Sequence, residues 1–190
     1  MDEEEVSVDE LINEDQVIIK KIISTHYIIN LDTTILDPSE YRSVFSILRD
    51  ATERDKITLI IDTDGGYATT MIQFFNYLLH TKAETTAEVY QACSAGAFIM
   101  CCVDHIILKD FCSIMFHQAY QDMTGSLAEI QDRVNFLDKQ NKEITNIVYS
   151  GFLTKGEINK IHSGQEVWID QKNGISRLKQ FKSIKQRLIK

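Results

Sequence analysis

The stretch YQACSAGAFIMC, residues 90–101, places one hydroxyl, that of Ser94, inside a run of small and apolar side chains. A buried serine most often returns its hydroxyl to a backbone carbonyl and serves only in packing. A nucleophile held on a tight turn has similar surroundings, because the backbone around it must pack closely. The rest of the chain has to decide between these two interpretations.

Strand-like and helix-like segments alternate on both sides of this stretch. The apolar run ITLIID, residues 57–62, is typical of a strand covered on both faces, and it passes through TDGG into a helical pattern over residues 68–80. The next segments are a strand over 85–92, a helix over 94–102, and two strands, HIILKD at 105–110 and CSIMFHQ at 112–118. The alternation predicts an α/β fold with a largely parallel sheet and helices on its faces.

A long helix is predicted to begin after Ser126. Ser126 and Glu129 form a capping-box pattern, and neither glycine nor proline follows until Gly151. A helix of about 26 residues is about 39 Å long, which is more than a small domain covers alone. We therefore expect part of this helix to pack on another subunit.

Charge is distributed unevenly along the 190 residues, whose net charge is −8. Residues 1–15 hold eight acids and no base, whereas residues 171–190 hold seven bases and no acid. We expect an acidic flexible N-terminal arm over 1–15, one domain over 16–170, and a basic C-terminal tail over 171–190 that forms a solvated helix. The mildly acidic middle argues against nucleic acid as a partner.

Cysteine usage and the N-terminal composition indicate the compartment. The four cysteines lie in apolar segments without a C-x-x-C pattern, which favours reduced, buried thiols over disulfides or a zinc site: Cys93, Cys101, Cys102 and Cys112. The acidic N-terminus is unlike a secretory signal, and no apolar run approaches the roughly 20 residues that span a bilayer. We expect a cytoplasmic protein with no membrane partner, no metal and no cofactor.

Ser94 is a nucleophile only if a base accepts its proton. His117 ends an apolar strand, and the carboxyl ends of parallel strands meet at one sheet edge, so it is the best candidate base. The other histidines lie near strand starts or helix ends: His26, His80, His105 and His162. Gly65 and Gly66 end a neighbouring strand, and with the N–H of Ala95 they are candidate donors to an oxyanion. The alternative is that DGG is only a strand-to-helix turn.

These motifs occur in a recognisable order: DGG, ACSAGAFIM, MFHQ, and GSLAEI opening the long helix. Over roughly residues 24–170 this order resembles the proteolytic subunit of the Clp protease family, serine peptidases whose usual pattern is N-S-P-G-G, small-Ser-Met-Gly and I-H-Q-P. The resemblance implies a crotonase-like βαβ spiral with a long handle helix, and a catalytic domain over 16–170. It implies Ser94 as nucleophile, His117 as general base, and an oxyanion hole at Gly65 and Ala95.

The third member of the triad is expected at Glu166 in QEVWID, where the family has an aspartate two residues before an aromatic. Asp170 is the next candidate, and three weaker ones follow: Asp104, Asp110 and Asp122. Cys93, beside Ser94, is a rival nucleophile. Adjacent residues on a tight turn point in different directions, and the family pattern favours Ser94.

The resemblance also implies the substrate and partners. Substrate binding falls on Gly66, Gln118 and Gly125, with the peptide lying as an added strand beside about residues 119–126. A homo-oligomeric ring or double ring is implied, and an AAA+ unfoldase is the family's partner. Here the acidic head does not resemble the N-terminal loops that meet such an unfoldase. Asp64 and Ala119 replace prolines, and Ala95 replaces methionine, so a divergent member, such as a viral copy, fits these departures.

Three functions are weighed on this basis. The first is a serine endopeptidase that hydrolyses unfolded proteins or peptides inside a self-compartmentalised oligomer through an acyl-enzyme at Ser94. The second is a catalytically silent ring or shell subunit, which Glu166 and Asp64 favour and the retained Ser94 and His117 oppose. The third is an acyl-CoA enzyme of the crotonase class, which shares the fold but uses no serine nucleophile.

Overall fold

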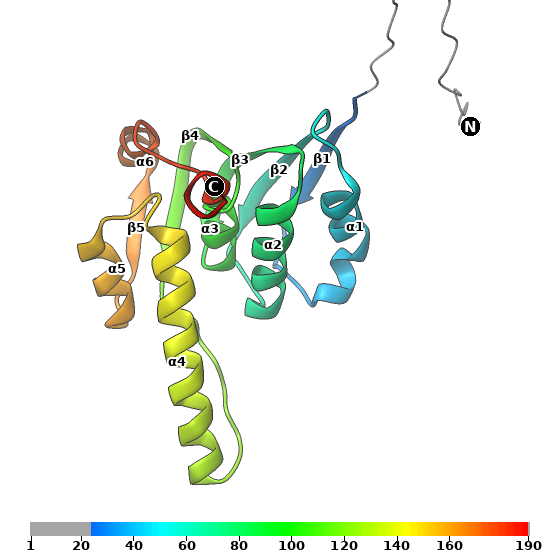
Figure 1. Cartoon of the computed structure of the whole chain (residues 1–190). Coiled ribbons are helices and arrows are strands. Elements are labelled where there is room, and N and C mark those ends of the chain that lie inside the picture. The colour runs from blue at the N-terminus through cyan, green and yellow to red at the C-terminus, as the bar shows by residue number, and fades with distance from the viewer. Residues whose placement is uncertain (1–23, 190) are drawn as a thin grey trace, which may run out of the picture.

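The computed structural model describes residues 24–189, and its centre is one five-stranded sheet (Figure 1). The strands lie in the order of the chain: β1 (His26–Leu31), β2 (Lys56–Thr63), β3 (Glu84–Cys93), β4 (His105–Phe116) and β5 (Val167–Asp170). The first four are parallel, and β5 pairs with β4 in the antiparallel direction. The predicted α/β class and largely parallel sheet are therefore confirmed.

One 3-10 helix and seven α-helices accompany the strands within residues 24–189. They are η1 (Pro38–Tyr41), α1 (Arg42–Asp50), α2 (Ala68–His80), α3 (Ala95–Met100), α4 (Leu127–Tyr149), α5 (Lys155–His162), α6 (Gln171–Leu178) and α7 (Ile184–Leu188). Each predicted helix between residues 68 and 152 is present near its expected bounds. None of the helices in this described range is long and apolar enough to cross a membrane.

The two strands expected over 105–110 and 112–118 are one strand, β4, which corrects that prediction. Phe111 adopts a left-handed conformation, with φ of 60°, and its side chain is 99% exposed. The pairing with β3 slips at this point, from Val89 opposite Leu108 to Gln91 opposite Ser113. The extra residues form a bulge that interrupts the apolar alternation without ending the strand.

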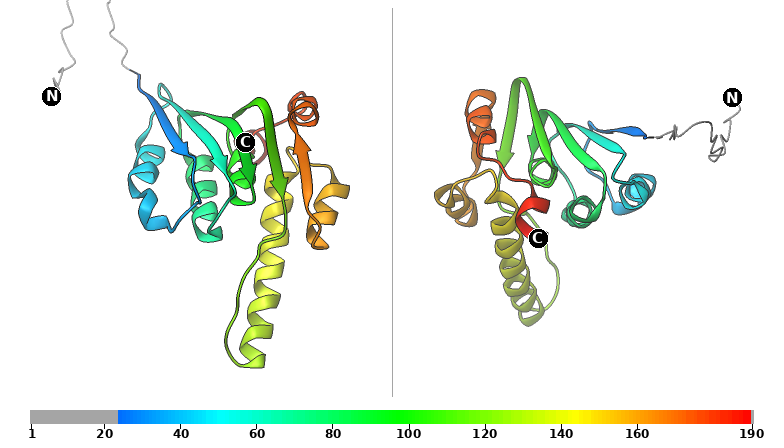
Figure 2. Two further views of the ribbon diagram at one scale, coloured as in Figure 1. Left: turned by 180° about the vertical axis from the view of Figure 1, so that it is seen from behind. Right: turned by 45° about the horizontal axis from the view of Figure 1, so that its top comes forward.

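The helices α1, α2 and α3 lie on the same face of the sheet (Figures 1 and 2). Leu59 and Ile61 of β2 are fully buried toward these helices, whereas Thr58 and Ile60 point to the other face and are half-buried. The expectation that ITLIID is covered on both faces is wrong for the single chain. Ile28 and Ile107 remain exposed on that uncovered face.

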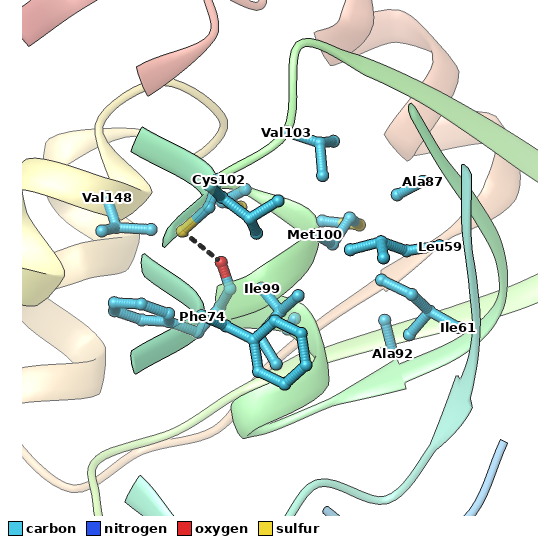
Figure 3. Close-up of a cluster of buried hydrophobic side chains, with 14 of the residues drawn as sticks. Leu59, Ile61, Phe74, Ala87, Ala92, Ile99, Met100, Cys102, Val103 and Val148 are labelled. Carbon is cyan, nitrogen blue, oxygen red and sulfur yellow. Dashed lines mark hydrogen bonds between the residues drawn. The ribbon is translucent and has the colours of Figure 1, made fainter. Parts of the chain in front are cut away.

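The hydrophobic core forms where α3 inserts between the sheet and the helices α2 and α4 (Figure 3). Phe98, Ile99 and Met100 have no exposed surface, and Phe74 of α2 is equally buried. The thiol of Cys102 donates to the carbonyl of Phe98 at 3.2 Å. All four cysteines are free and buried, as predicted. The core thus fixes the start of α3, where Ser94 lies.

The long helix α4 projects away from the body of the protein, and the segment that follows β4 runs back along it (Figure 1). Ser126 and Glu129 form the predicted capping box at its start. Within this helix only Val148 and Tyr149 are buried, at its C-terminal end, where the helix meets the body of the protein. Leu127 and Phe136 are 89% and 64% exposed. The expectation that much of this helix has no cover within its own chain is met.

The basic tail expected over 171–190 is helical in α6 and α7, and both helices pack on the domain. Ile184 has no exposed surface, and the guanidinium of Arg187 donates to the carbonyls of Ile147 and Val148 at the end of α4. Burial lowers the pKa of Arg187. A solvated helix is therefore the wrong description of this tail. The arm expected over 1–15 lies outside the described residues.

Candidate active site

Ser94 stands at the junction of β3 and α3 in a strained backbone conformation, with φ of 55°. Left-handed conformations are costly for residues other than glycine and persist where surrounding structure enforces them. Here the Ser94 N–H donates to the carbonyl of Met115 on β4 at 2.9 Å, and its carbonyl accepts from the N–H of Phe98 at 3.1 Å. A strained serine on a strand-to-helix turn is the geometry of a nucleophile elbow.

His117 follows the last residue of β4 and lies beside Ser94. Its Nε2 is 2.7 Å from the Ser94 Oγ, a hydrogen bond between side chains 23 residues apart in the chain. The parallel pairing of Cys93 with Met115 sets this contact, because it brings the carboxyl ends of β3 and β4 to the same level. The two groups are within the distance at which a base accepts a hydroxyl proton.

Two glycines after β2 approach the nucleophile turn closely. Gly65 has φ of 105°, and a Cβ there would lie 2.6 Å from the Ser94 Cβ and 3.1 Å from the Ala95 nitrogen. A Cβ at Gly66 would lie 2.0 Å from the carbonyl oxygen of Ile35. Only glycine fits either position, so DGG is more than an ordinary turn: it brings backbone against Ser94.

The backbone N–H groups around Ser94 differ in whether another atom of the protein already accepts their hydrogen bond. The Gly65 N–H donates to the Thr63 Oγ1 at 3.0 Å. Ala95 is the first residue of α3, so its N–H belongs to the first turn, whose donors have no partner inside the helix. The bridge between Ile35 and Gly66 uses the Gly65 carbonyl and the Tyr67 N–H. The N–H of Gly66 therefore points away from Ile35.

The carboxylate of Asp64, where the resembling family has proline, is hydrogen-bonded to a neighbouring strand. The side-chain amide of Gln91 on β3 donates to its Oδ1. The carboxylate is exposed to solvent, which screens it further. The negative charge that the sequence places near the oxyanion position is thus partly compensated.

Glu166 lies one residue before β5 and opposite His117. The ladder pairs Met115 with Trp168 and Phe116 with Val167, and the next step of that register brings His117 to Glu166. The carboxylate of Glu166 nevertheless accepts a hydrogen bond from the indole Nε1 of Trp168 at 2.8 Å. The extended register therefore puts the expected third residue across from the base, but its carboxylate is hydrogen-bonded to a different donor.

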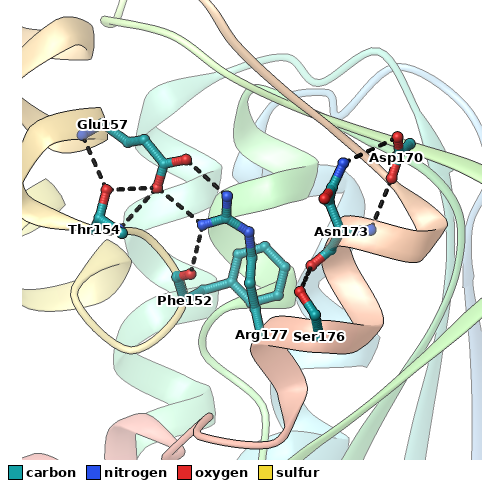
Figure 4. Close-up of polar contacts among 7 residues, drawn as sticks. All are labelled: Phe152, Thr154, Glu157, Asp170, Asn173, Ser176 and Arg177. Atoms are coloured by element: carbon teal, nitrogen blue, oxygen red, sulfur yellow. Dashed lines mark hydrogen bonds and ion pairs between the residues drawn. The ribbon is translucent and has the colours of Figure 1, made fainter.

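Three of the other candidate acids, all except Asp122, have hydrogen-bond partners away from His117. Asp170 caps α6 through the N–H of Asn173 at 2.8 Å (Figure 4). Asp104 accepts from Lys185 at 2.9 Å, which with Thr85 holds the pKa of this carboxyl low despite burial. Asp110 accepts from Gln171 at 2.9 Å. These three carboxylates therefore serve the fold.

Cys93 is buried beside Ser94, and its environment disfavours the reactive form. Burial raises the pKa of the Cys93 thiol, and the carboxylates of Asp64 and Glu166 raise it further. The thiolate is the nucleophilic form of cysteine. The rival nucleophile is therefore poorly activated.

A cavity of about 180 Å³ opens at Ser94 and His117. Gly66 and Gln118 line it, whereas Gly125 lies at the start of α4 and is not part of its lining. Sequence reasoning did not place four polar residues in its wall: Asn141, Lys142, Thr145 and His162. The only sequence signal was the spacing of Asn141, Thr145 and Tyr149, which places them on one side of a helix.

Within residues 24–189, no three His, Cys, Asp or Glu side chains gather in a way that could hold a metal ion. The chemistry available at the cavity is that of a serine hydroxyl, an imidazole and backbone N–H groups. This set is suited to acyl transfer.

The model of the family described as Clp protease matches residues 13–172. No curated protein sequence matches the chain significantly.

Proposed function

The chain belongs to the Clp protease family, and from this premise we propose that it is a serine endopeptidase with Ser94 as nucleophile and His117 as general base. One observation carries the proposal: the 2.7 Å hydrogen bond between the His117 Nε2 and the Oγ of a serine in a strained, left-handed turn. A serine with only a packing role has no need of either feature. The arrangement matches the nucleophile and base of a catalytic triad.

The proposed reaction proceeds through an acyl-enzyme. His117 accepts the Ser94 proton as the Oγ attacks the carbonyl carbon of the peptide bond, which places a negative charge on the carbonyl oxygen. When this tetrahedral intermediate collapses, the imidazolium gives its proton to the leaving amine and Ser94 holds an ester. Water, deprotonated by His117, then attacks the ester, and the proton returns to the Ser94 Oγ as the acid product leaves.

The oxyanion forms next to backbone N–H groups that are already in place. Ala95 is the first donor, because its N–H lies at the start of α3 with no partner inside the helix. The second donor comes from the glycine pair. Gly65 remains the expectation from the family pattern, and Gly66 is the alternative, since Gly65 donates to Thr63 here and Gly66 lines the cavity.

Glu166 is the proposed orienting acid. A residue directly opposite on a neighbouring strand lies about 5 Å away between Cβ atoms, and a glutamate side chain spans that distance. Rotation of its side chain away from Trp168 brings the carboxylate toward the Nδ1 of His117. There it stabilises the imidazolium and fixes the tautomer in which Nε2 accepts a proton.

The substrate is proposed to be an unfolded polypeptide or a peptide, held as an added strand beside about residues 119–126. Backbone pairing of this kind tolerates many sequences. The exposed apolar residues of α4, among them Leu127 and Phe136, are proposed to pack on other copies of the chain in a homo-oligomeric ring or double ring. Enclosure in such a particle would protect folded proteins. An AAA+ unfoldase is not needed for cleavage of short peptides.

A second candidate function is a silent subunit of a ring or shell. The hydrogen bond between Glu166 and Trp168 favours it, because His117 then has no carboxylate to orient it. The third function considered, an acyl-CoA enzyme, does not use the bonded serine and histidine. We therefore rank it last.

The test is labelling by a fluorophosphonate, which reacts with activated serines, followed by mass mapping of the labelled peptide. We expect label on Ser94, unchanged labelling in Cys93→Ala, and loss of both label and peptide hydrolysis in Ser94→Ala and His117→Ala. A silent subunit would remain unlabelled while eluting as an oligomer. Labelling that depends on Cys93 and not on Ser94 would reassign the nucleophile.

A further inference from the structure

The cavity beside Ser94 and His117 has an apolar side and a polar side. Met71, Tyr149 and Ile161 provide buried apolar surface. The polar side is formed by Asn141, Lys142 and Thr145 of α4 and by His162 at the end of α5. A pocket meant only for aliphatic side chains would not place four polar groups next to its catalytic atoms.

The hydrogen bonds between these residues define what the pocket offers. The Thr145 hydroxyl donates its proton to the carbonyl of Asn141 at 2.6 Å. His162 Nε2 lies 2.9 Å from the Thr145 Oγ1. Since the hydroxyl proton of Thr145 is already used, the imidazole must be the donor in this contact. A neutral imidazole that donates from Nε2 keeps Nδ1 as an acceptor.

The charges around the pocket favour this neutral imidazole. Burial lowers the pKa of His162, and the positive charge of Lys142 lowers it further, while Asp138 acts weakly in the other direction. Lys142 is itself paired with Asp138 at 2.7 Å. The residues that line the pocket therefore include a lysine, an imidazole that keeps one acceptor nitrogen and the side-chain amide of Asn141, with no carboxylate among them.

We propose that this cavity binds the side chain at P1, the residue whose carbonyl Ser94 attacks, and selects an uncharged hydrogen-bonding side chain such as that of glutamine. The inference rests on the proposed peptidase function and names its specificity. The P1 side chain is the one closest to the attacked carbonyl, and this cavity is lined by Ser94 and His117 themselves.

The size and chemistry of the cavity agree with glutamine. Its volume of about 180 Å³ equals that of about six water molecules, which accommodates the five non-hydrogen atoms of this side chain. A glutamine amide donates as well as accepts, so it suits both the His162 Nδ1 and the Lys142 ammonium. Leucine of similar size would strip water from these groups without replacing its hydrogen bonds. Lysine at P1 would meet the charge of Lys142.

The test compares three fluorogenic peptides that differ only in P1, namely glutamine, leucine and lysine, on the full-length protein. We expect kcat/KM to be about fivefold higher for glutamine than for leucine, the factor that one hydrogen bond of ordinary net strength provides. His162→Leu and Thr145→Val should each remove most of this preference. A ratio of kcat/KM for two substrates does not depend on how much of a variant is folded.

His80→Leu is the matched control, since His80 ends α2 and is not among the lining residues. It should leave the ratio unchanged. Equal or better cleavage of the leucine peptide by the wild type, with Ser94 labelled by fluorophosphonate, overturns the specificity and leaves the peptidase intact. An absence of both labelling and cleavage overturns the peptidase and the specificity together. A preference for glutamine that persists in both His162→Leu and Thr145→Val shows that residues outside this cavity recognise the glutamine side chain.

Discussion

The contact between Glu166 and Trp168 makes a prediction about the rate of catalysis. If Glu166 orients His117 only after leaving the indole, then the indole competes with the imidazole for the same carboxylate. Trp168→Phe keeps an aromatic ring at that position and removes only the donor. We therefore expect this variant to have a higher kcat than the wild type.

The size of the increase follows from the strength of one hydrogen bond. The bond between Trp168 Nε1 and Glu166 is 2.8 Å long, but both side chains are exposed, so we take its net contribution as about 1 kcal/mol. Removing it shifts the population toward the oriented state by about fivefold. Glu166→Gln should act in the opposite direction, because an uncharged group at this position of a serine-protease triad costs up to about four orders of magnitude.

The assay is hydrolysis of a fluorogenic peptide, with the concentration of active sites measured by fluorophosphonate titration. The pH dependence of kcat reports on the imidazole, so Trp168→Phe should also move its acid limb, which a purely structural effect would not do. Asp170→Ala is the control. Asp170 caps α6, and its loss should lower thermal stability while leaving kcat per active site unchanged.

Two results would refute this reasoning. An unchanged kcat in Glu166→Gln would mean that another residue, or none, orients His117. A kcat in Trp168→Phe equal to or below that of the wild type would mean that the indole does not compete for the carboxylate. In the second case Trp168 would instead hold Glu166 in its working position.

Three further predictions concern the fold around the site. Gly65→Ala should lower kcat/KM about a hundredfold or more, since its Cβ would lie 2.6 Å from that of Ser94. A variant with the kinetics of the wild type would show that the backbone at residue 65 does not lie this close to Ser94. Phe136→Ser should shift the particle to smaller species in light scattering without changing its circular dichroism. Arg177, with hydrogen bonds from Thr154, lowers the pKa of Glu157 from 4.5 to about 2 (Figure 4). These contacts together add about 3 kcal/mol to the stability at neutral pH, which is lost as pH falls from 4.5 toward 2. Urea unfolding of Arg177→Met should show a smaller loss of stability over that pH range.

Much of the fold could be predicted from local patterns. The helix over residues 68–80 and the capping box at Ser126 depend on periodicity and on side chains three residues apart, which the sequence displays directly. The continuity of strand β4 and the packing of the C-terminal tail were harder to predict. A left-handed Phe111 carries no sequence signal, and the burial of Ile184 depends on elements far away in the chain.

The same division applies to the site. Ser94 and His117 were predictable because each sits at the carboxyl end of a parallel strand, and the sheet topology alone brings such ends together. The hydrogen bond that makes them a pair depends on the register of β3 and β4. The hydrogen-bond partner of Glu166 is either the Trp168 indole or the His117 imidazole. Interatomic distances decide between these two donors, and residue types do not.

From residue types and spacing alone came the α/β class, the helix that projects from the body, and the serine and histidine of the site. Tertiary structure decided the uncovered face of the sheet, the docking of the basic tail and the polar wall formed by Thr145 and His162. The physical reason is the range of the interactions. Helix caps and strand alternation arise between residues a few positions apart, whereas a pocket is made by side chains from separate helices whose separation is set only by packing.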